Sequence, residues 1–178
     1  MRQVRPVEVH WKLFSLEEIN KGEDKTVDWE NGRTAPLLRV LALVRRKHGE
    51  DAVDRFYGAL GRARFVHEKE FKDPSVIEDA LAEAGLDRGL RAAALADPGT
   101  REEVQREHKG VVDKLEAFGV PTLVLDDGEG PGMFGPVINP VPTGEDAGKL
   151  WDHSLWLTRQ EGFFELKRTR GPQNAPRH

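Results

Sequence analysis

The chain opens on an alternation of apolar and polar residues. The apolar positions are Val7, Val9, Trp11 and Leu13, and a charged residue or a histidine stands between each pair. A period of two over β-branched and aromatic residues predicts a strand with one buried face. Residues 15–34, which follow, are rich in charged residues, glycine and asparagine, and this composition predicts an irregular surface loop.

The middle of the chain has the spacing of amphipathic helices. Thr34 can cap one helix, and Asp73-Pro74 and Asp97-Pro98 give the same start signal twice more. Glycines at positions 49, 85 and 119 end the apolar stripes. We therefore expect a succession of helices over residues 34–49, 51–62, 73–85, 86–96 and 97–119.

The pattern changes after Gly119. Residues 120–125 and 133–138 are short apolar runs separated by a polar, glycine-rich turn, which predicts a β-hairpin. Thr143, with Asp146 three residues later, resembles a capping box and begins a helix that ends near Gly162. This order indicates a mixed α/β protein, and 178 residues suit a single domain.

Composition narrows the classes of function. The chain is 38% hydrophobic and 33% charged, and it contains no run near the roughly 20 apolar residues that a membrane helix needs, so we expect no membrane partner. The first residues do not form a secretory signal, which favours a cytoplasmic location. A formal charge of −4 argues against nucleic acid as a partner, and the basic stretch from Lys167 to His178 is typical of a frayed end.

The absence of cysteine is the strongest constraint on chemistry. It excludes disulfides, cysteine-based zinc sites, iron–sulfur clusters and a cysteine nucleophile anywhere in these residues. The six histidines show no close ligand spacing, so we expect no metal site, and His108 on an apolar helix face is expected to be partly buried and satisfied. No catalytic residue can be assigned.

One proline stands at a position that permits two interpretations. Pro121, in Gly119-Val120-Pro121-Thr122, lies between a long helix and a β run. The local sequence favours a plain proline at the start of a strand over a functional cis-proline.

Several blocks carry a resemblance to a known family. They are residues 4–9, Ser15-Leu16 with Ile19-Asn20, residues 119–122, residues 134–137, and above all residues 144–152 and 163–170. The chain resembles the DsbA-like thioredoxin-fold group, which includes the kappa-class glutathione transferases and the 2-hydroxychromene-2-carboxylate isomerases. It is most similar to actinobacterial mycothiol-dependent nitroreductase-like proteins.

The resemblance implies an α/β, thioredoxin-like fold with an inserted helical subdomain. Residues 1–34 and 119–170 would form the thioredoxin-like part, residues 35–118 the helical insertion and connecting helix, and residues 171–178 a tail. The family's first strand, Cys-Pro turn and first helix have no counterpart here. Their absence would leave two strands beside an empty slot, and each unpaired backbone group would cost on the order of 1–3 kcal/mol.

The resemblance also implies where substrate binds. The proline matching Pro121 is cis in the family, and the backbone matching Val120 pairs with bound peptide or thiol. Asn20 matches a substrate-side asparagine, and Trp29 is placed in the same cleft by position. The chain itself implies no cofactor, whereas the family implies mycothiol or another low-molecular-weight thiol.

Three functions remain open from the sequence. The first is a thiol–disulfide or small-thiol-dependent oxidoreductase domain present without its catalytic cysteine, with coding sequence expected upstream of Met1. The second is a non-catalytic thioredoxin-like module that binds a small thiol or peptide and forms a homodimer or accepts a strand from a partner. The third is an enzyme like the kappa-class transferases or isomerases.

Overall fold

A computed structural model of the chain describes residues 2–169, so the expected tail at 171–178 lies outside the described residues. The chain divides into two compact units. The helical unit comprises residues 10–119, and the hairpin unit combines residues 2–9 with residues 120–169. Residues 10–34, which the resemblance grouped with the thioredoxin-like part, belong to the helical unit. The expectation of a single domain stays a prediction.

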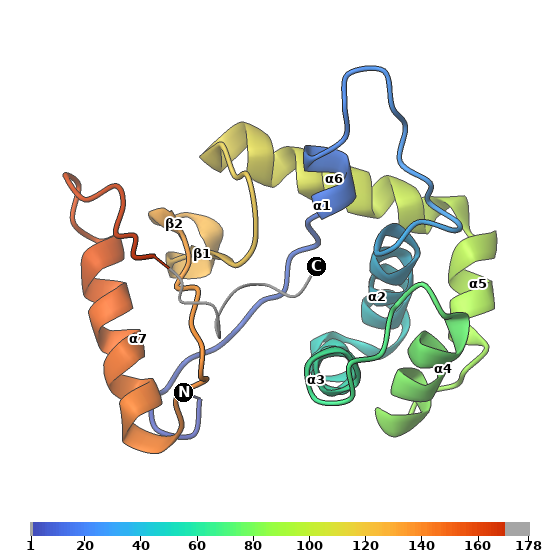
Figure 1. Ribbon diagram of the computed structural model, residues 1–178, viewed down its shortest axis with the longest axis horizontal. Coiled ribbons are helices and arrows are strands. Elements are labelled where there is room, and N and C mark those ends of the chain that lie inside the picture. Colours follow the sequence, from blue (N-terminus) through green and yellow to red (C-terminus); the bar gives the residue numbers. More distant parts are fainter. Residues whose placement is uncertain (1, 170–178) are drawn as a thin grey trace. The chain divides into compact units, whose positions relative to one another are not determined.

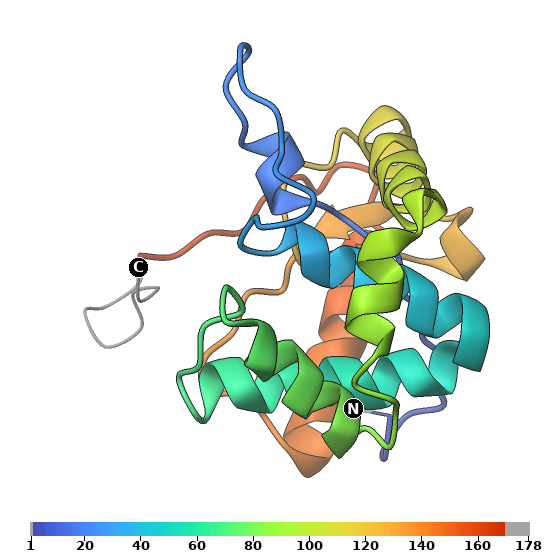
Figure 2. The same cartoon turned by 90° about the vertical axis from the view of Figure 1, so that its right-hand side faces the viewer.

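The helical unit begins with a short helix, α1 (Leu16–Ile19), after which the chain loops outward before α2 begins (Figures 1 and 2). The longer helices are α2 (Ala35–His48), α3 (Glu50–Phe65), α4 (Pro74–Glu83), α5 (Leu90–Ala96) and α6 (Pro98–Leu115). These agree with the predicted helices to within a few residues. Helix α6 ends before Gly119 because Glu116 takes a left-handed conformation, with φ 51°.

Helix starts follow the local signals. The Asp73 carboxylate accepts a hydrogen bond from the Ser75 backbone N–H at 2.9 Å, and Asp97 accepts one from Gly99 at 2.9 Å. A proline follows each aspartate at the first helical position, where its missing N–H costs nothing. Both helix starts were therefore predictable from two adjacent residues.

Helix α2 is the centre of the core of the helical unit. It contacts α3, α5 and α6, and Val40 and Val44 on it are completely buried. Phe56 from α3, Leu81 from α4 and Val104 from α6 are also completely buried in the helical unit. Spacing of apolar residues at three and four positions places them on the inward faces of these helices.

The predicted strand over residues 7–13 does not form, although its alternating burial does. Val7, Val9 and Trp11 are half-buried and Leu13 is buried, while the residues between them are exposed. Side chains take the hydrogen bonds that a neighbouring strand would make: the Leu13 N–H donates to Glu107 at 2.8 Å, and the Trp11 carbonyl accepts from Arg45 at 3.1 Å. Alternation of apolar and polar residues indicates that an extended segment buries one of its faces. A strand additionally needs a neighbouring strand to accept and donate its backbone hydrogen bonds.

The hairpin unit contains the predicted hairpin and the predicted last helix. Strands β1 (Thr122–Val124) and β2 (Gly132–Phe134) pair antiparallel, with Leu123 opposite Met133, and a 3₁₀ turn, η1 (Asp126–Gly128), joins them. Helix α7 (Gly144–Thr158) follows. The hairpin is the one sheet among residues 2–169, so the structure is mixed α and β, and the thioredoxin-like sheet stays a prediction.

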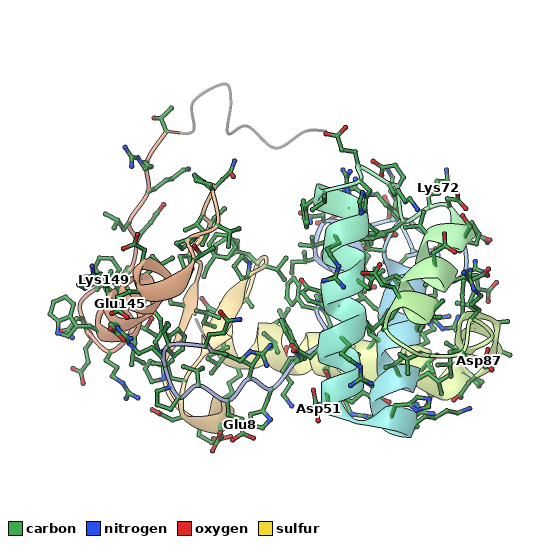
Figure 3. All side chains as sticks on the ribbon, turned by 90° about the horizontal axis from the view of Figure 1, so that it is seen from below. Glu8, Asp51, Lys72, Asp87, Glu145 and Lys149 are labelled. Carbon is green, nitrogen blue, oxygen red and sulfur yellow. The ribbon has the colours of Figure 1, made fainter. Side chains whose placement is uncertain are left out.

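Arg5 attaches the first residues to α7. Its guanidinium contacts Glu145 and Asp152, each at 2.7 Å, and Gly148 lies between these two carboxylates on the helix. Figure 3 labels Glu145 and, one turn later, Lys149. The hydrogen bonds from Arg5 lower the pKa of both carboxyl groups. The family-like blocks at residues 4–9 and 144–152 therefore meet in the fold.

No helix within residues 2–169 combines the length and the apolar character needed to cross a membrane.

Candidate functional site

A cleft of about 600 Å³ lies in the helical unit between α1, the following loop and the start of α2. Its size is within the ~300–1,000 Å³ typical of small-molecule sites. The lining residues are Leu16, Glu17, Asn20, Lys21, Lys25, Thr26, Val27, Asp28, Arg33 and Thr34. We call it the Asn20 cleft, after the predicted site residue that it contains.

Glu17 holds the two ends of this cleft together. Its carboxylate accepts hydrogen bonds from the Thr34 hydroxyl at 2.8 Å, from the Ala35 N–H at 2.9 Å and from the Thr34 N–H. These N–H groups begin α2, where the helix dipole favours negative charge. Gly32 passes close to the same carboxylate, since a Cβ there would lie 2.6 Å from Glu17 Oε2 and 2.3 Å from the Asp28 carbonyl oxygen. The loop is thereby fixed against α1.

Asn20 is oriented by a bond within α1. Its Nδ2 donates to the Leu16 carbonyl at 2.8 Å, at the end of that helix. This bond assigns the amide orientation, and Oδ1 makes no hydrogen bond to any described residue. Asn20 therefore offers the cleft an oriented acceptor for an N–H or O–H group of a ligand.

The acidic groups of the cleft are already engaged, whereas two basic groups are not. Backbone hydrogen bonds from Asn31 and Glu30 lower the pKa of Asp28 and keep it ionised. The side chains of Lys25 and Arg33 form no ion pair or hydrogen bond within residues 2–169. The cleft therefore presents excess donors and positive charge, which suits a ligand rich in acceptor oxygens.

Val27 and Asp28 line this cleft, but the adjacent Trp29 does not. Its residue surface is 4% exposed, and its ring packs in the helical core, with the Arg101 guanidinium carbon 5.7 Å from the ring centroid. Its carbonyl accepts a hydrogen bond from Arg39 at 3.3 Å. A role for Trp29 in binding substrate stays a prediction.

Val120 and Pro121 belong to the hairpin unit, and Asn20 and Trp29 belong to the helical unit. Val120 is 47% exposed, and the peptide bond that joins it to Pro121 is cis. The Pro121 carbonyl accepts from the Gly135 N–H at 2.8 Å, next to the ladder of β1 and β2. The role of this pair in binding peptide or thiol stays a prediction.

Sequence reasoning missed Lys25 and Arg33 and placed His108 correctly. His108 is 7% exposed, and its Nδ1 accepts a hydrogen bond from the Ser15 N–H at 3.3 Å, so the expected burial is confirmed and one of the two ring nitrogens has a partner. Lysine and arginine in a polar loop carry no signal that separates a binding residue from a solvated one. No group of three or more metal-ligating side chains occurs among the described residues.

The arrangement can bind and orient a small polar molecule, while thiol–disulfide chemistry needs a thiol that these residues lack. The family is established by comparison. Residues 1–168 match the family model Rv2466c-like, described as mycothiol-dependent nitroreductase Rv2466c, and the chain belongs to this family.

One relative supports the assignment. The chain is 34% identical over 171 residues to "Uncharacterized protein Rv2286c" of Mycobacterium tuberculosis (strain ATCC 25618 / H37Rv). The match covers 95% of this chain and 72% of the relative. The resemblance to mycothiol-dependent nitroreductase-like proteins is thus confirmed at the level of the family, and with it the class of thiol-dependent oxidoreductases.

Proposed function

We propose that this chain is the small-thiol-binding part of a thiol-dependent oxidoreductase, and that the Asn20 cleft holds the thiol, with mycothiol as the first candidate. The single observation that carries the proposal is that the asparagine singled out by family resemblance lines a cleft of about 600 Å³ in a chain of this family.

The cleft supplies binding and orientation. Asn20 Oδ1 would accept a hydrogen bond from an amide N–H or a hydroxyl of the thiol. Lys25 and Arg33 would donate to its carbonyl or hydroxyl oxygens. Binding the thiol in one orientation turns a bimolecular encounter into a step within a complex, which is the contribution that such residues make to rate.

The reacting sulfur must come from outside these residues. Thiol–disulfide exchange requires an attacking thiolate, and the chain contains no cysteine. The thiolate is therefore supplied by the bound small thiol itself or by a Cys-Pro turn on further polypeptide, as the family resemblance implies. Intact mass and N-terminal peptide mapping of the endogenous protein distinguish these two sources of the thiolate. A cysteine-bearing peptide before Met1 supports the second source, and a mass of 20.0 kDa rules it out.

A binding titration tests the cleft. The chain is titrated with reduced mycothiol and followed by amide chemical shifts of residues 15–34. Asn20→Ala should weaken binding about 2- to 10-fold, the equivalent of one net hydrogen bond. Gln160→Ala is the matched control, because Gln160 Nε2 donates to the Trp156 carbonyl at the end of α7 as Asn20 does at the end of α1. Equal affinity of all three proteins would refute the assignment.

The second candidate is a non-catalytic binding module, and the absence of cysteine favours it. In that case Val120 and Pro121 would hold a peptide or thiol through backbone hydrogen bonds, and a second copy or another protein would add a strand to the hairpin unit. The two candidates differ in one assay. Mycothiol-dependent reduction of a nitroaromatic compound by the endogenous protein supports the oxidoreductase, and binding without turnover supports the module.

A further inference from the structure

Helix α1 has four residues, so contacts outside the helix must hold it in place. This short helix nonetheless carries Glu17 and ends at Asn20, and both residues line the Asn20 cleft. Asn20 Nδ2 bonds to the Leu16 carbonyl of the same helix at 2.8 Å. The position of Asn20 Oδ1 in the cleft therefore depends on where α1 lies.

Ser15 connects α1 to α6. Its hydroxyl accepts a hydrogen bond from the Glu18 N–H at 3.1 Å and caps the first turn of α1. Its own N–H donates to Nδ1 of His108, on α6, at 3.3 Å. Ser15 is completely buried, so no water molecule reaches its N–H to take the place of His108. A displacement of Ser15 from His108 would therefore displace the cap of α1.

The His108 ring accepts this hydrogen bond only while the ring is neutral. The bond to Nδ1 places the proton of the neutral ring on Nε2, whereas a protonated ring has a donor at both nitrogens. Burial lowers the pKa of His108, which keeps the ring neutral near pH 7. The Phe14 ring, whose centroid lies 4.7 Å from that of the imidazole, adds an apolar neighbour. Protonation would set the N–H groups of Ser15 and His108 against each other.

The charged groups that neighbour His108 on α1 and α6 form ion pairs. The pairs are Glu18 with Lys21, Lys109 with Asp113, and Glu107 with Arg45. Glu18 favours the protonated ring, and its partner Lys21 opposes it. Because each of these carboxylates is balanced by a cation, burial decides that the ring is neutral.

Building on the proposed thiol-binding function, we propose that His108 is a positioning residue for the Asn20 cleft: its neutral ring holds Ser15 and α1, and its protonation loosens α1 and weakens binding of the small thiol. Two other contacts keep the segment attached, since Glu107 accepts the Leu13 N–H at 2.8 Å and Glu17 accepts the Ala35 N–H at 2.9 Å. The expected effect is therefore about 2- to 10-fold in affinity, as for one net hydrogen bond.

The test compares reduced mycothiol titrations at pH 7 and pH 5, followed by the amide shifts of residues 15–34. A thiol with an ordinary pKa of about 8.5 stays protonated at both pH values. Wild-type affinity should be about 2- to 10-fold lower at pH 5. His108→Asn, whose amide oxygen can accept the Ser15 N–H at either pH, should bind equally at both. An unchanged wild-type affinity, or an equal fall in His108→Asn, would overturn the proposal.

Two more variants separate positioning from a general effect of histidine or of packing. His153→Asn removes an exposed histidine of α7 and should keep the pH dependence of the wild type. His108→Leu fills the space without an acceptor, so it should bind about 2- to 10-fold more weakly already at pH 7, where His108→Asn binds as the wild type does. Equal affinities of the two His108 variants at pH 7 would refute the positioning role. If circular dichroism shows that His108→Leu does not fold, the pH profile of His108→Asn still decides.

A measurement without ligand distinguishes failure of this proposal from failure of the proposed function. Ring ¹H–¹⁵N spectra give the protonation midpoint of His108, and the amide signals of Ser15 and Glu18 are followed in the same pH series. Both amides should shift with the midpoint of the ring in the wild type and stay constant in His108→Asn. Amides that do not follow the ring, or a ring that stays neutral down to pH 5, would contradict the positioning role. Failure of the wild type to bind mycothiol at pH 7 would instead refute the function proposed for the cleft.

Discussion

The buried arginine of α2 gives the most demanding test of how the helical unit is held together. Arg39 is 3% exposed, and no carboxylate accepts a hydrogen bond from it among the described residues. Its guanidinium donates instead to the Thr100 hydroxyl at 3.0 Å and to backbone carbonyls. These are the carbonyls of Trp29 at 3.3 Å, Ala94 at 3.1 Å, Leu95 at 3.0 Å and Asp97 at 3.2 Å. The cation therefore closes the C-terminal end of α5.

Replacing Arg39 with methionine keeps most of the volume and removes every donor. Without the guanidinium, the Ala94 carbonyl still accepts from the Asp97 N–H at 3.3 Å, and the Asp97 carbonyl still accepts from the Thr100 N–H at 3.1 Å. The Thr100 hydroxyl can donate to one of these two carbonyls at a time. The Trp29 and Leu95 carbonyls have no other hydrogen bond within residues 2–169. At about 1–3 kcal/mol for each acceptor left unsatisfied, Arg39→Met should lower the free energy of unfolding by about 2–6 kcal/mol. This is a large part of the ~5–15 kcal/mol available to a domain.

The assay is urea unfolding monitored by far-ultraviolet circular dichroism. The slope of the unfolding free energy against urea concentration is compared between variants. Arg106→Met is the control, because Arg106 is exposed, and it should change stability by less than about 0.5 kcal/mol. Replacing a buried ionic group with an apolar side chain can also stabilise a protein. An Arg39→Met variant within about 1 kcal/mol of the wild type would therefore refute the view that these carbonyls need the guanidinium.

Two further predictions concern a cap and a titration. Asp73→Ala removes the acceptor for the Ser75 N–H at the start of α4, so it should lower stability by about 0.5–2 kcal/mol in the same urea assay; no change would contradict the cap. Burial lowers the pKa of His108 in the folded chain below the ordinary histidine value of about 6.5. As the pH falls below 6.5, His108 therefore takes up a proton more readily in the unfolded chain than in the folded chain. The contribution of His108 to stability should be complete above pH 6.5 and fall as the pH drops below it. Unfolding measured from pH 7 to pH 5 should show a steeper loss in the wild type than in His108→Asn, and parallel curves would contradict this.

The sequence by itself determined the elements whose hydrogen bonds are local. Asp73 and Asp97 cap helices through N–H groups two residues away, and a turn rich in glycine joins the two strands of the hairpin. These bonds form between neighbours in the chain, so adjacent letters suffice to predict them. The absence of cysteine likewise settled that these residues carry no thiol chemistry of their own.

Only the tertiary structure decided which polar side chains face a cavity. Glu17 lies in a different helix from the N-terminus of α2 that it caps. The Nδ1 of His108, on α6, accepts a hydrogen bond from the N–H of Ser15, which is 93 residues earlier in the chain. The strand predicted over residues 7–13 failed for the same reason, because a strand needs a partner that its own pattern does not specify. Contacts between residues distant in the chain depend on how helices pack, and packing is a property of the whole core.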